Sequence, residues 1–387
     1  MKDIPYGRQS INSQDTRAIS DAILDNFLTQ GPRVEEFENA LCERLGAAHG
    51  VAVNSATSAL HIACMALGVT KGDLVWTSAI TFVASANCAR YCGADVDFVD
   101  IDPKTYNMSI EALAKKLEEA SNVGRLPKVL IPVHLTGQPC DMSEIHELSK
   151  VYGFSIIEDA SHATGAEYRE WKIGSGQFSD ITVFSFHPVK IITTGEGGAA
   201  LTNSKSLSKT MRQLRSHGIT REHEDFADQS QPSFYYEQQN LGFNYRLTDF
   251  QAALGLTQLS RLEQFLERRR EIAKYYDENL VHTNATLPFQ DSSTKSAWHL
   301  YVVRVGETKN PQKRNVIFEE LRSRGIGVNL HYIPVYRHPY YASLGYKLSD
   351  FPEAEAYFSQ AISIPIHAEL TQEDQDYVIN SLIELNV

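Results

Sequence analysis

Short apolar runs alternate with amphipathic runs between about residue 50 and residue 202, and this alternation restricts the possible folds more than any other feature of the chain. Four of the gaps between the apolar runs have apolar residues at helical spacing. Strand and helix in alternation predict a mostly parallel sheet with helices on both faces. The seven predicted strands are GVAVN, LVWTSAI, DVDFVDI, KVLIPVHL, FSIIEDA, ITVFSF and GAALTN.

Polar or aromatic side chains follow several of these predicted strands. In open α/β sheets, ligands bind beyond the carboxyl ends of the strands. The chain segments at such ends are therefore the first candidates for a functional site: Asn54 and Ser55, Thr81 and Phe82, Asp159, and residues 185–190.

The pattern changes near residue 250. Residues 247–280 predict a long helical stretch broken at Gly255, and the remainder predicts a strand over 297–305, a helix over 312–325, a strand over 326–333 and a last helix over 371–385. We therefore expect a large domain of residues 1–255 and a smaller C-terminal α/β domain of residues 256–387. Residues 221–240 show neither the helical nor the strand period of apolar residues, and they predict an irregular loop.

The composition of the 387-residue chain excludes several classes of function. A formal net charge of −12 argues against nonspecific nucleic-acid binding, and it requires a local basic pocket for any anionic substrate. There is no run of about 18 apolar residues, so we expect no membrane span. The first residues lack the apolar core of a signal peptide, so we expect a cytoplasmic protein.

A metal site is not expected. Cys88 and Cys92 lie one helical turn apart, but buried small hydrophobic residues explain this spacing better than a metal or a disulfide does. The other potential ligands are too scattered for a zinc site: His134, Cys140, His146 and His162.

The two familiar phosphate-binding loops are absent from the sequence. No G-x-x-x-x-G-K-[ST] motif occurs. GSGQFS, with Gly174 and Gly176, approaches G-x-G-x-x-G but precedes a predicted strand, so a plain turn is the better interpretation.

A single lysine, Lys190, stands between the apolar strand ITVFSF and the glycine-rich turn GEGG. Most lysines are exposed. A lysine at a buried strand end loses basicity, however, and becomes a usable nucleophile or base. Asp159 ends another predicted strand and can pair with a cationic ring nitrogen. A lysine that forms a Schiff base and an aspartate beside a pyridinium are the arrangement used to bind pyridoxal 5'-phosphate (PLP).

PLP also requires a phosphate site, and NSATSALH supplies one. Ser55, Ala56, Thr57 and Ser58 open a predicted helix whose N-terminus favours an anion. Ordinary capping explains one hydroxyl but not three clustered together. Ser185 adds a further hydroxyl, and Phe82 follows a strand end where it can lie on a flat ring.

The complete pattern resembles the nucleotide-sugar aminotransferases of the DegT/StrS family, which are PLP enzymes of fold type I. The resemblance extends from the first residues nearly to the last and is closest to the PseC-like branch, the UDP-sugar C4 aminotransferases of the pseudaminic acid pathway. The motifs that carry it are EDASHA, FSFHPVKIITTGEGGA, RSHGI, LGFNYRLTDFQAALG and HYIPVY, with LTQGPRVEEFE and NSATSALH in support.

The resemblance implies a role for each matching residue. Lys190 corresponds to the Schiff-base lysine and Asp159 to the partner of the pyridine nitrogen. His162 would lie near the ring hydroxyl, Phe82 on the ring, and Asn244 would reach the phosphate from a neighbouring subunit, which implies a homodimer with shared active sites. The residues that match the phosphate site are Ala56, Thr57, Ser58 and Ser185. Those that match the substrate site are Tyr6, Thr29, Gln30, Gly31, Arg246, His331 and Tyr332.

Several residues keep two interpretations. His331 is either a substrate ligand or a satisfied structural histidine. Arg246 and Arg215 are either ordinary ion-pair partners or the local positive charge that a diphosphate needs, with a binding role slightly favoured for Arg246. We expect His187 to be structural and Glu196 to serve only through its backbone.

The resemblance predicts transfer of an amino group from L-glutamate to C4 of a 4-keto-6-deoxy UDP-N-acetyl sugar, with Lys190 as the general base. Two alternatives stay open at this point. The substrate could be a dTDP-sugar, a UDP-4-keto-pentose or another keto sugar. The chain could also be a non-catalytic sensor that keeps the fold of PLP enzymes, although the intact lysine and aspartate count against this.

Overall fold

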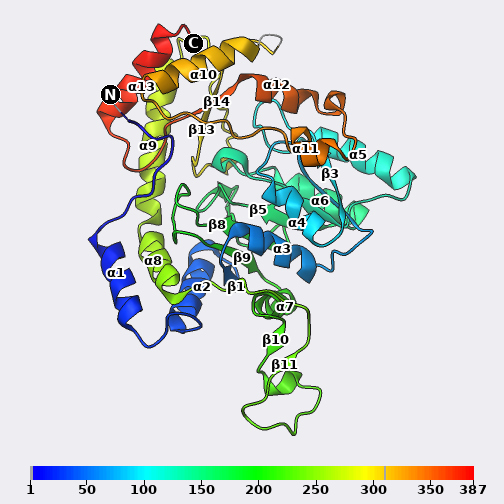
Figure 1. The fold of residues 1–387 in the computed structure, drawn as a ribbon. Coiled ribbons are helices and arrows are strands. Elements are labelled where there is room, and N and C mark those ends of the chain that lie inside the picture. Colours follow the sequence, from blue (N-terminus) through cyan, green and yellow to red (C-terminus); the bar gives the residue numbers. More distant parts are fainter. Residues whose placement is uncertain (1–2, 309–310) are drawn as a thin grey trace.

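A seven-stranded, mostly parallel sheet forms the centre of the computed structural model, which describes residues 3–308 and 311–387 (Figure 1). The strand order is β1-β9-β8-β5-β4-β2-β3. Only β9 runs antiparallel to its neighbours, which are β1 and β8. The strands are β1 (His49–Val53), β2 (Leu74–Ser78), β3 (Asp95–Val99), β4 (Val129–Ile131), β5 (Ser155–Asp159), β8 (Ile181–Ser185) and β9 (Gly198–Thr202). The predicted seven-stranded, mostly parallel sheet is therefore confirmed.

Both faces of the sheet are buried because helices cover both. Ile157 packs into one hydrophobic cluster and its neighbour Ile156 into another, as the alternation of side chains along a strand requires. The first cluster includes α3 (Ala56–Ala66), α4 (Ala84–Tyr91) and α7 (Lys205–Arg215). The second includes α2 (Pro32–Leu45), α5 (Ile110–Asn122), α6 (Met142–Tyr152) and α8 (Asp249–Ser260).

The predicted long helix is interrupted at a different place from the one expected. α8 ends at Ser260 and α9 (Leu262–Leu280) begins after Arg261, whereas Gly255 lies inside α8. A Cβ atom at Gly255 would come within 2.7 Å of the Phe37 ring, so this glycine serves close helix packing instead of a break. The prediction of a break at Gly255 was wrong.

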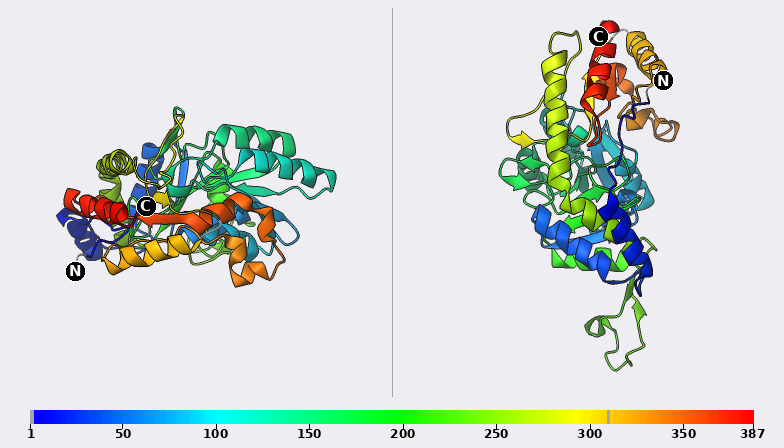
Figure 2. Two further views of the ribbon diagram at one scale, coloured as in Figure 1. Left: turned by 90° about the horizontal axis from the view of Figure 1, so that it is seen from above. Right: turned by 90° about the vertical axis from the view of Figure 1, so that its left-hand side faces the viewer.

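The C-terminal part packs around the far end of α9 (Figure 2). β13 (Tyr301–Arg304) pairs antiparallel with β14 (Ala361–Ile364), and a third hydrophobic cluster joins these strands to α9, α10 (Pro311–Ser323) and α13 (Gln372–Glu384). Ile4 belongs to the same cluster. The predicted strand over 326–333 was wrong, because this segment makes only two isolated bridges, from Ile326 to Ile4 and from Asn329 to Ser363. The division into domains 1–255 and 256–387 stays a prediction.

An arm projects from the body next to α7 (Figures 1 and 2). β10 (Ile219–Thr220) pairs with β11 (Glu237–Gln238), and the chain between them is irregular apart from the short 3-10 helix η2 (His223–Asp225). Its aromatic side chains Phe234 and Tyr236 are exposed. In a single chain the arm therefore exposes apolar surface to the solvent.

The remaining elements connect these layers. They are α1 (Ser13–Leu24), η1 (Leu135–Gly137), β6 (Glu167–Tyr168), β7 (Trp171–Lys172), β12 (Thr294–Lys295), η3 (Val335–Arg337), α11 (Pro339–Ala342), η4 (Leu348–Asp350) and α12 (Pro352–Gln360). Among the described residues, no helix combines the length and the apolar character that crossing a bilayer requires.

Candidate active site

A cavity of about 790 Å³ lies at the carboxyl ends of the central strands. β5, β8 and the start of α3 supply one wall, and the C-terminal segment 329–332 supplies the facing one. The residues predicted from the sequence that line it are Tyr6, Ala56, Thr57, Ser58, Phe82, Asp159, His162, Ser185, Lys190, His331 and Tyr332. The rule that ligands bind beyond the strand ends thus identified the location of the cavity.

Lys190 enters the cavity from the turn that follows β8. Its backbone N–H donates to the carbonyl of His187 at 2.9 Å, which fixes the turn. Burial of the side chain lowers the pKa of Lys190 to about 8, although the nearby charge of Asp159 acts in the opposite direction. Near neutral pH a much larger fraction of this amine is therefore neutral than in an ordinary lysine, and the neutral form is the nucleophile or base.

Asp159 ends β5 and is 4% exposed. Its Oδ2 accepts a hydrogen bond of 2.6 Å from the Ser85 hydroxyl, and its Oδ1 accepts one of 2.6 Å from the Ser161 hydroxyl and one of 3.1 Å from the Ser161 backbone N–H. Because the single proton of Ser85 points to Asp159, Thr81 is the donor in the 2.8 Å hydrogen bond between Thr81 and Ser85. These donors hold the carboxylate group in place and leave lone pairs free for a further partner.

The predicted phosphate site is the N-terminus of α3. Ser55 caps this helix, and its Oγ accepts a hydrogen bond of 3.1 Å from the backbone N–H of Ser58. The Ser58 hydroxyl donates to the side chain of Asn54 at 2.7 Å. β9 approaches closely here: a Cβ atom at Gly198 would lie 2.5 Å from the Ala56 nitrogen. Only glycine at position 198 leaves this helix end where it is, with its dipole directed at the cavity.

A group of histidines lines the wall that faces Lys190. His162 Nε2 is 3.0 Å from the Tyr332 hydroxyl, and the His162 ring lies 4.4 Å from that of His299. Burial is the main cause that holds the pKa of His162 and of His299 well below the usual value, so both rings are neutral. The Nδ1 atoms of both rings are buried without a hydrogen-bond partner. Such orphaned atoms require an explanation, and a polar ligand in the cavity supplies one.

His331 and Phe82 differ in how firmly their neighbours hold them. His331 Nδ1 is 2.8 Å from the Ser363 hydroxyl, and its ring lies 5.3 Å from that of Tyr6. Burial lowers the pKa of His331 to about 3, so this ring supplies no positive charge for a phosphate. Phe82 is 56% exposed at the cavity, with its ring 6.0 Å from that of Tyr332. The Phe82 face is therefore available to a flat ring.

Five predicted residues lie outside the cavity of one chain: Thr29, Gln30, Gly31, Asn244 and Arg246. Thr29 bridges to Thr248, and the Gly31 backbone N–H donates to Asp249 Oδ2 at 2.9 Å. Asn244 is exposed. Arg246 Nη1 donates to the Ser216 hydroxyl at 3.2 Å and bridges to Val53 through its backbone. The roles of these five residues stay predictions.

Arg215 and Arg246 have different surroundings, which separates the two interpretations of them. Arg215 forms an ion pair with Glu38, which is 1% exposed. It also donates to the Ala52 carbonyl at 2.7 Å. Arg215 is thus an ion-pair partner of the core. Arg246 has no carboxylate partner among the described residues.

Sequence reasoning assigned no role to several residues that contribute to the cavity or hold Asp159, among them Ser85, Ser161, Gly197 and His299. Ser85 follows Phe82 by one helical turn, and Ser161 follows Asp159 by two residues, so local spacing could have indicated both. Gly197 lines the cavity beside Gly198. His299 gave no signal, because its position depends on Trp298, whose φ is +48°. His187 and Glu196 also line the cavity.

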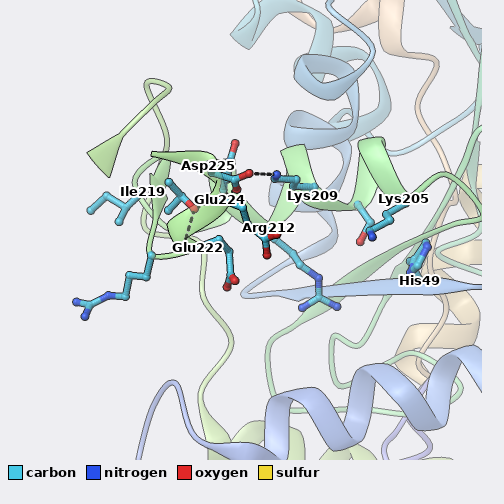
Figure 3. A pocket seen from close by; sticks show the side chains of 12 residues that line it. His49, Lys205, Lys209, Arg212, Ile219, Glu222, Glu224 and Asp225 are labelled. Atoms are coloured by element: carbon cyan, nitrogen blue, oxygen red, sulfur yellow. Dashed lines mark hydrogen bonds and ion pairs between the residues drawn. The ribbon is translucent and has the colours of Figure 1, made fainter. Parts of the chain in front are cut away.

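A second pocket, of about 570 Å³, lies between α7 and the arm (Figure 3). Two of its basic residues form ion pairs: Lys209 with Asp225, and Arg212 with Glu38 at 2.8 Å. Lys205 lines the same pocket. The pocket brings together no lysine and carboxylate at strand ends and is not the candidate active site.

Within residues 3–308 and 311–387, no group of three or more His, Cys, Asp or Glu side chains is arranged to hold a metal ion.

The cavity fits PLP in each of its functional groups. The N-terminus of α3 and the hydroxyls of Thr57 and Ser185 suit a phosphate. Asp159 suits a protonated ring nitrogen, and the Lys190 amine suits an aldehyde. The two unpartnered histidine nitrogens suit a ring substituent. The fold and this site together define a PLP-dependent aminotransferase of fold type I.

Residues 9–383 match the DegT/DnrJ/EryC1/StrS aminotransferase family, and the chain belongs to this family. It is 39% identical over 386 residues to the UDP-4-amino-4,6-dideoxy-N-acetyl-beta-L-altrosamine transaminase of Campylobacter jejuni, covering 99% of this chain and 97% of that one. It is also similar to the solved structure of Helicobacter pylori PseC, an aminotransferase involved in the biosynthesis of pseudoaminic acid. That similarity has a TM-score of 0.90 and 32% identity and covers 100% of this chain and 99% of PseC.

The cofactor has support from a third protein. The PLP-form of the sugar aminotransferase Spr1654 from Streptococcus pneumoniae aligns with a TM-score of 0.89 and 29% identity, covering 100% of this chain and 98% of that one. PLP is the cofactor of the family. The predicted fold, enzyme class and cofactor are confirmed.

Proposed function

We propose that the protein transfers an amino group from L-glutamate to C4 of a 4-keto-6-deoxy UDP-N-acetyl sugar. The observation that carries this proposal is one cavity in which the Lys190 amine, the Asp159 carboxylate and the N-terminus of α3 come together. Similarity along nearly the whole chain to a relative named for transamination of a UDP-linked amino sugar supports the choice of substrate.

The residues around the cavity divide the tasks of binding between them. Ala56, Thr57, Ser58 and Ser185 would hold the phosphate of PLP. Asp159 would hold the proton of the ring nitrogen, while Ser85 and Ser161 keep its carboxylate in place. His162 would meet the ring hydroxyl through its unpartnered Nδ1, and Phe82 would cover one face of the ring.

When bound, PLP supplies an aldehyde that condenses with amines and a ring that accepts an electron pair. Lys190 Nζ is the atom that would move the proton at the reacting carbon. With its pKa lowered to about 8, the amine can accept a proton in one half-reaction and return it in the other. Because one cavity would serve the donor and the acceptor in turn, the kinetics should be ping-pong.

The cavity of one chain is poor in positive charge. Among the described residues that line it, Lys190 is the only lysine or arginine, whereas Asp159 and Glu196 are acidic. A sugar nucleotide carries a diphosphate, for which arginine is the usual partner. The missing charge supports a homodimer with shared active sites, in which Asn244 and Arg246 of one subunit would face the cavity of the other.

The dimer proposal also accounts for the exposed segments. The side chains of Thr29 and Gln30 are exposed, as is Asn244. A C2 dimer would bring such segments to the cavity of a second copy, where they would meet the sugar nucleotide. We place the enzyme in the cytoplasm, in agreement with the sequence-based expectation.

A panel of substrates tests the proposal directly. The purified enzyme is incubated with L-glutamate and 4-keto UDP- and dTDP-sugars, and the products are identified by NMR. We expect an amine at C4 of the 4-keto-6-deoxy UDP-N-acetyl sugar. Faster turnover of a dTDP-sugar or a UDP-4-keto-pentose would assign a different substrate, and no release of 2-oxoglutarate with any sugar would favour the sensor.

A further inference from the structure

The side chains of Tyr332 and His162 meet in the wall of the cavity. The Tyr332 hydroxyl is 3.0 Å from His162 Nε2, and the two ring planes differ by only 29°. These residues are 170 positions apart in the chain, so the fold alone brings them together. The family resemblance assigns His162 to the cofactor and Tyr332 to the substrate, and it does not connect the two.

Two neighbouring rings hold the imidazole of His162 in one orientation. The centre of the His299 ring lies 4.4 Å from that of His162, and the centre of the Tyr332 ring lies 5.9 Å from it. His162 is 4% exposed. Its Nδ1 is buried and has no hydrogen-bond partner among the described residues. One ring nitrogen therefore meets Tyr332, and the other is left for a group that enters the cavity.

The protonation states of both side chains follow from their burial. Burial, together with the charge of Lys190, holds the pKa of His162 well below its usual value, so the ring is neutral and carries a single proton. Burial also raises the pKa of Tyr332 well above its usual value, so the hydroxyl keeps its proton and can donate it. The single proton of His162 lies on either Nδ1 or Nε2, and the hydrogen bond to Tyr332 decides between them.

Counting unsatisfied groups distinguishes the two tautomers of His162. If Nε2 carried the proton and donated it, the Tyr332 hydroxyl would find no acceptor in the part of the chain that the structure describes, and the buried Nδ1 lone pair would have no donor. If Tyr332 donates to Nε2 instead, only the Nδ1–H group is left without a partner. The second arrangement leaves fewer buried polar groups unsatisfied, and such groups are rare in folded proteins.

We propose that Tyr332 is a positioning residue that fixes the tautomer of His162: its hydroxyl donates to Nε2 and keeps the proton of the ring on Nδ1, where it can be donated to the cofactor. The inference rests on the proposed role of His162 at the ring hydroxyl of PLP. An N–H group at this place stabilises an ionised ring oxygen, whereas the other tautomer would present a lone pair to it. Tyr332 thus acts on the cofactor through His162, in addition to the substrate contact that the resemblance implies.

The pH dependence of the absorbance of the bound cofactor tests this role in the holoenzyme, without any sugar. His162→Ala removes the donor to the ionised ring oxygen, so the midpoint of the titration should rise by about one pH unit. Tyr332→Phe keeps the His162 ring but removes the hydroxyl that fixes its tautomer, so the midpoint should rise by about half a pH unit. The double variant should have the midpoint of His162→Ala, because Tyr332 acts only through His162.

Tyr276→Phe is the matched control, because it removes a tyrosine hydroxyl elsewhere in the chain. Tyr276 is fully buried, donates to the Pro365 carbonyl at 2.8 Å and does not line the cavity. Its substitution should leave the midpoint unchanged. The other titratable groups that line the cavity are the same in every variant, so a difference in midpoint reports on His162 and Tyr332. Thermal unfolding establishes that each variant is folded.

The possible outcomes separate this inference from the proposed function. A raised midpoint in His162→Ala with an unchanged one in Tyr332→Phe would overturn the role of Tyr332, even if the KM for the sugar nucleotide rises. A further rise in the double variant would also overturn it, since Tyr332 would then act on the cofactor directly. An unchanged midpoint in His162→Ala would refute the role of His162 and this inference with it. The choice of substrate is decided independently by the substrate panel.

Discussion

The inner wall and the rim of the candidate active site are built differently. The inner wall, here Asp159, Lys190 and the N-terminus of α3, comes from strand ends and a capped helix, and its groups are held within one chain. The proposed rim, residues 29–31 and 244–246, is anchored by backbone bridges outside the cavity of one chain. In our proposal this contrast separates chemistry from recognition: one chain would supply the reacting groups, and a second chain would supply contacts to the charged substrate.

The largest expected effect concerns the inner wall. Lys190→Ala should lower turnover by more than about 10³-fold, because none of the other lysines that the structure describes lines the cavity to accept and return the proton. The measurement is release of 2-oxoglutarate from L-glutamate. Lys205→Ala, an exposed lysine in the second pocket, is the matched control and should keep activity within about twofold. Retained turnover in a verified Lys190→Ala protein would discard the proposed mechanism.

Asp159→Asn should reduce turnover by about 10²- to 10³-fold while cofactor remains bound. The amide has no negative charge to hold the ring proton, and its NH₂ group would face a hydroxyl that now donates to Asp159. The rate is measured by single-turnover kinetics, and the bound cofactor is quantified in the purified variant. Near-normal turnover would remove the proton-holding role from Asp159.

The rim residue Asn244 offers a test of the shared site by subunit mixing. Asn244→Ala alone should weaken cofactor binding, and Lys190→Ala alone should be inactive. After dissociation and mixing in equal amounts, about one quarter of wild-type turnover should return, because half of the dimers are mixed and each contains one intact site. If the mixture has no more turnover than the separate variants, Asn244 would belong to the site of its own chain. The proposed difference between inner wall and rim would then be wrong.

A smaller effect on turnover is expected for Ser85, which donates a hydrogen bond to Asp159. Ser85→Ala removes one hydrogen bond to the carboxylate and should lower turnover by about tenfold. The KM for L-glutamate should change little, since Ser85 is not among the residues that line the cavity. The pH dependence of the absorbance of the bound cofactor should shift as well, which a merely structural role would not produce. An unchanged profile would contradict the positioning role of Ser85.

The inner wall was predictable from sequence because it obeys local rules. Strand ends, helix caps and the apolar run before Lys190 depend on residues close in the chain, and they pointed to Asp159, Ser55 and Lys190, which all line the cavity. Local spacing could have placed Ser85 one helical turn after Phe82, but it could not have shown the contact of Ser85 with Asp159, 74 residues away in the chain.

The rest depends on close approaches between distant segments. Gly137, with φ of +108°, allows the backbone of Trp298 and His299 to pass next to His162, since a Cβ atom there would lie 2.9 Å from the Trp298 nitrogen. No spacing in the sequence encodes that approach. The same limit explains the wrong prediction of a helix break at Gly255. From sequence alone a glycine indicates a helix break, and only the structure shows that Gly255 packs against the Phe37 ring.

Reduction of the holoenzyme with borohydride, followed by peptide mapping at a series of pH values, tests the central claim most directly. The account predicts one pyridoxyl adduct, on Lys190. It also predicts that apoprotein captures added PLP faster as the pH rises through about 8, since the amine becomes neutral there instead of near its ordinary value of 10.5. An adduct on another lysine, or no adduct at all, would contradict the account.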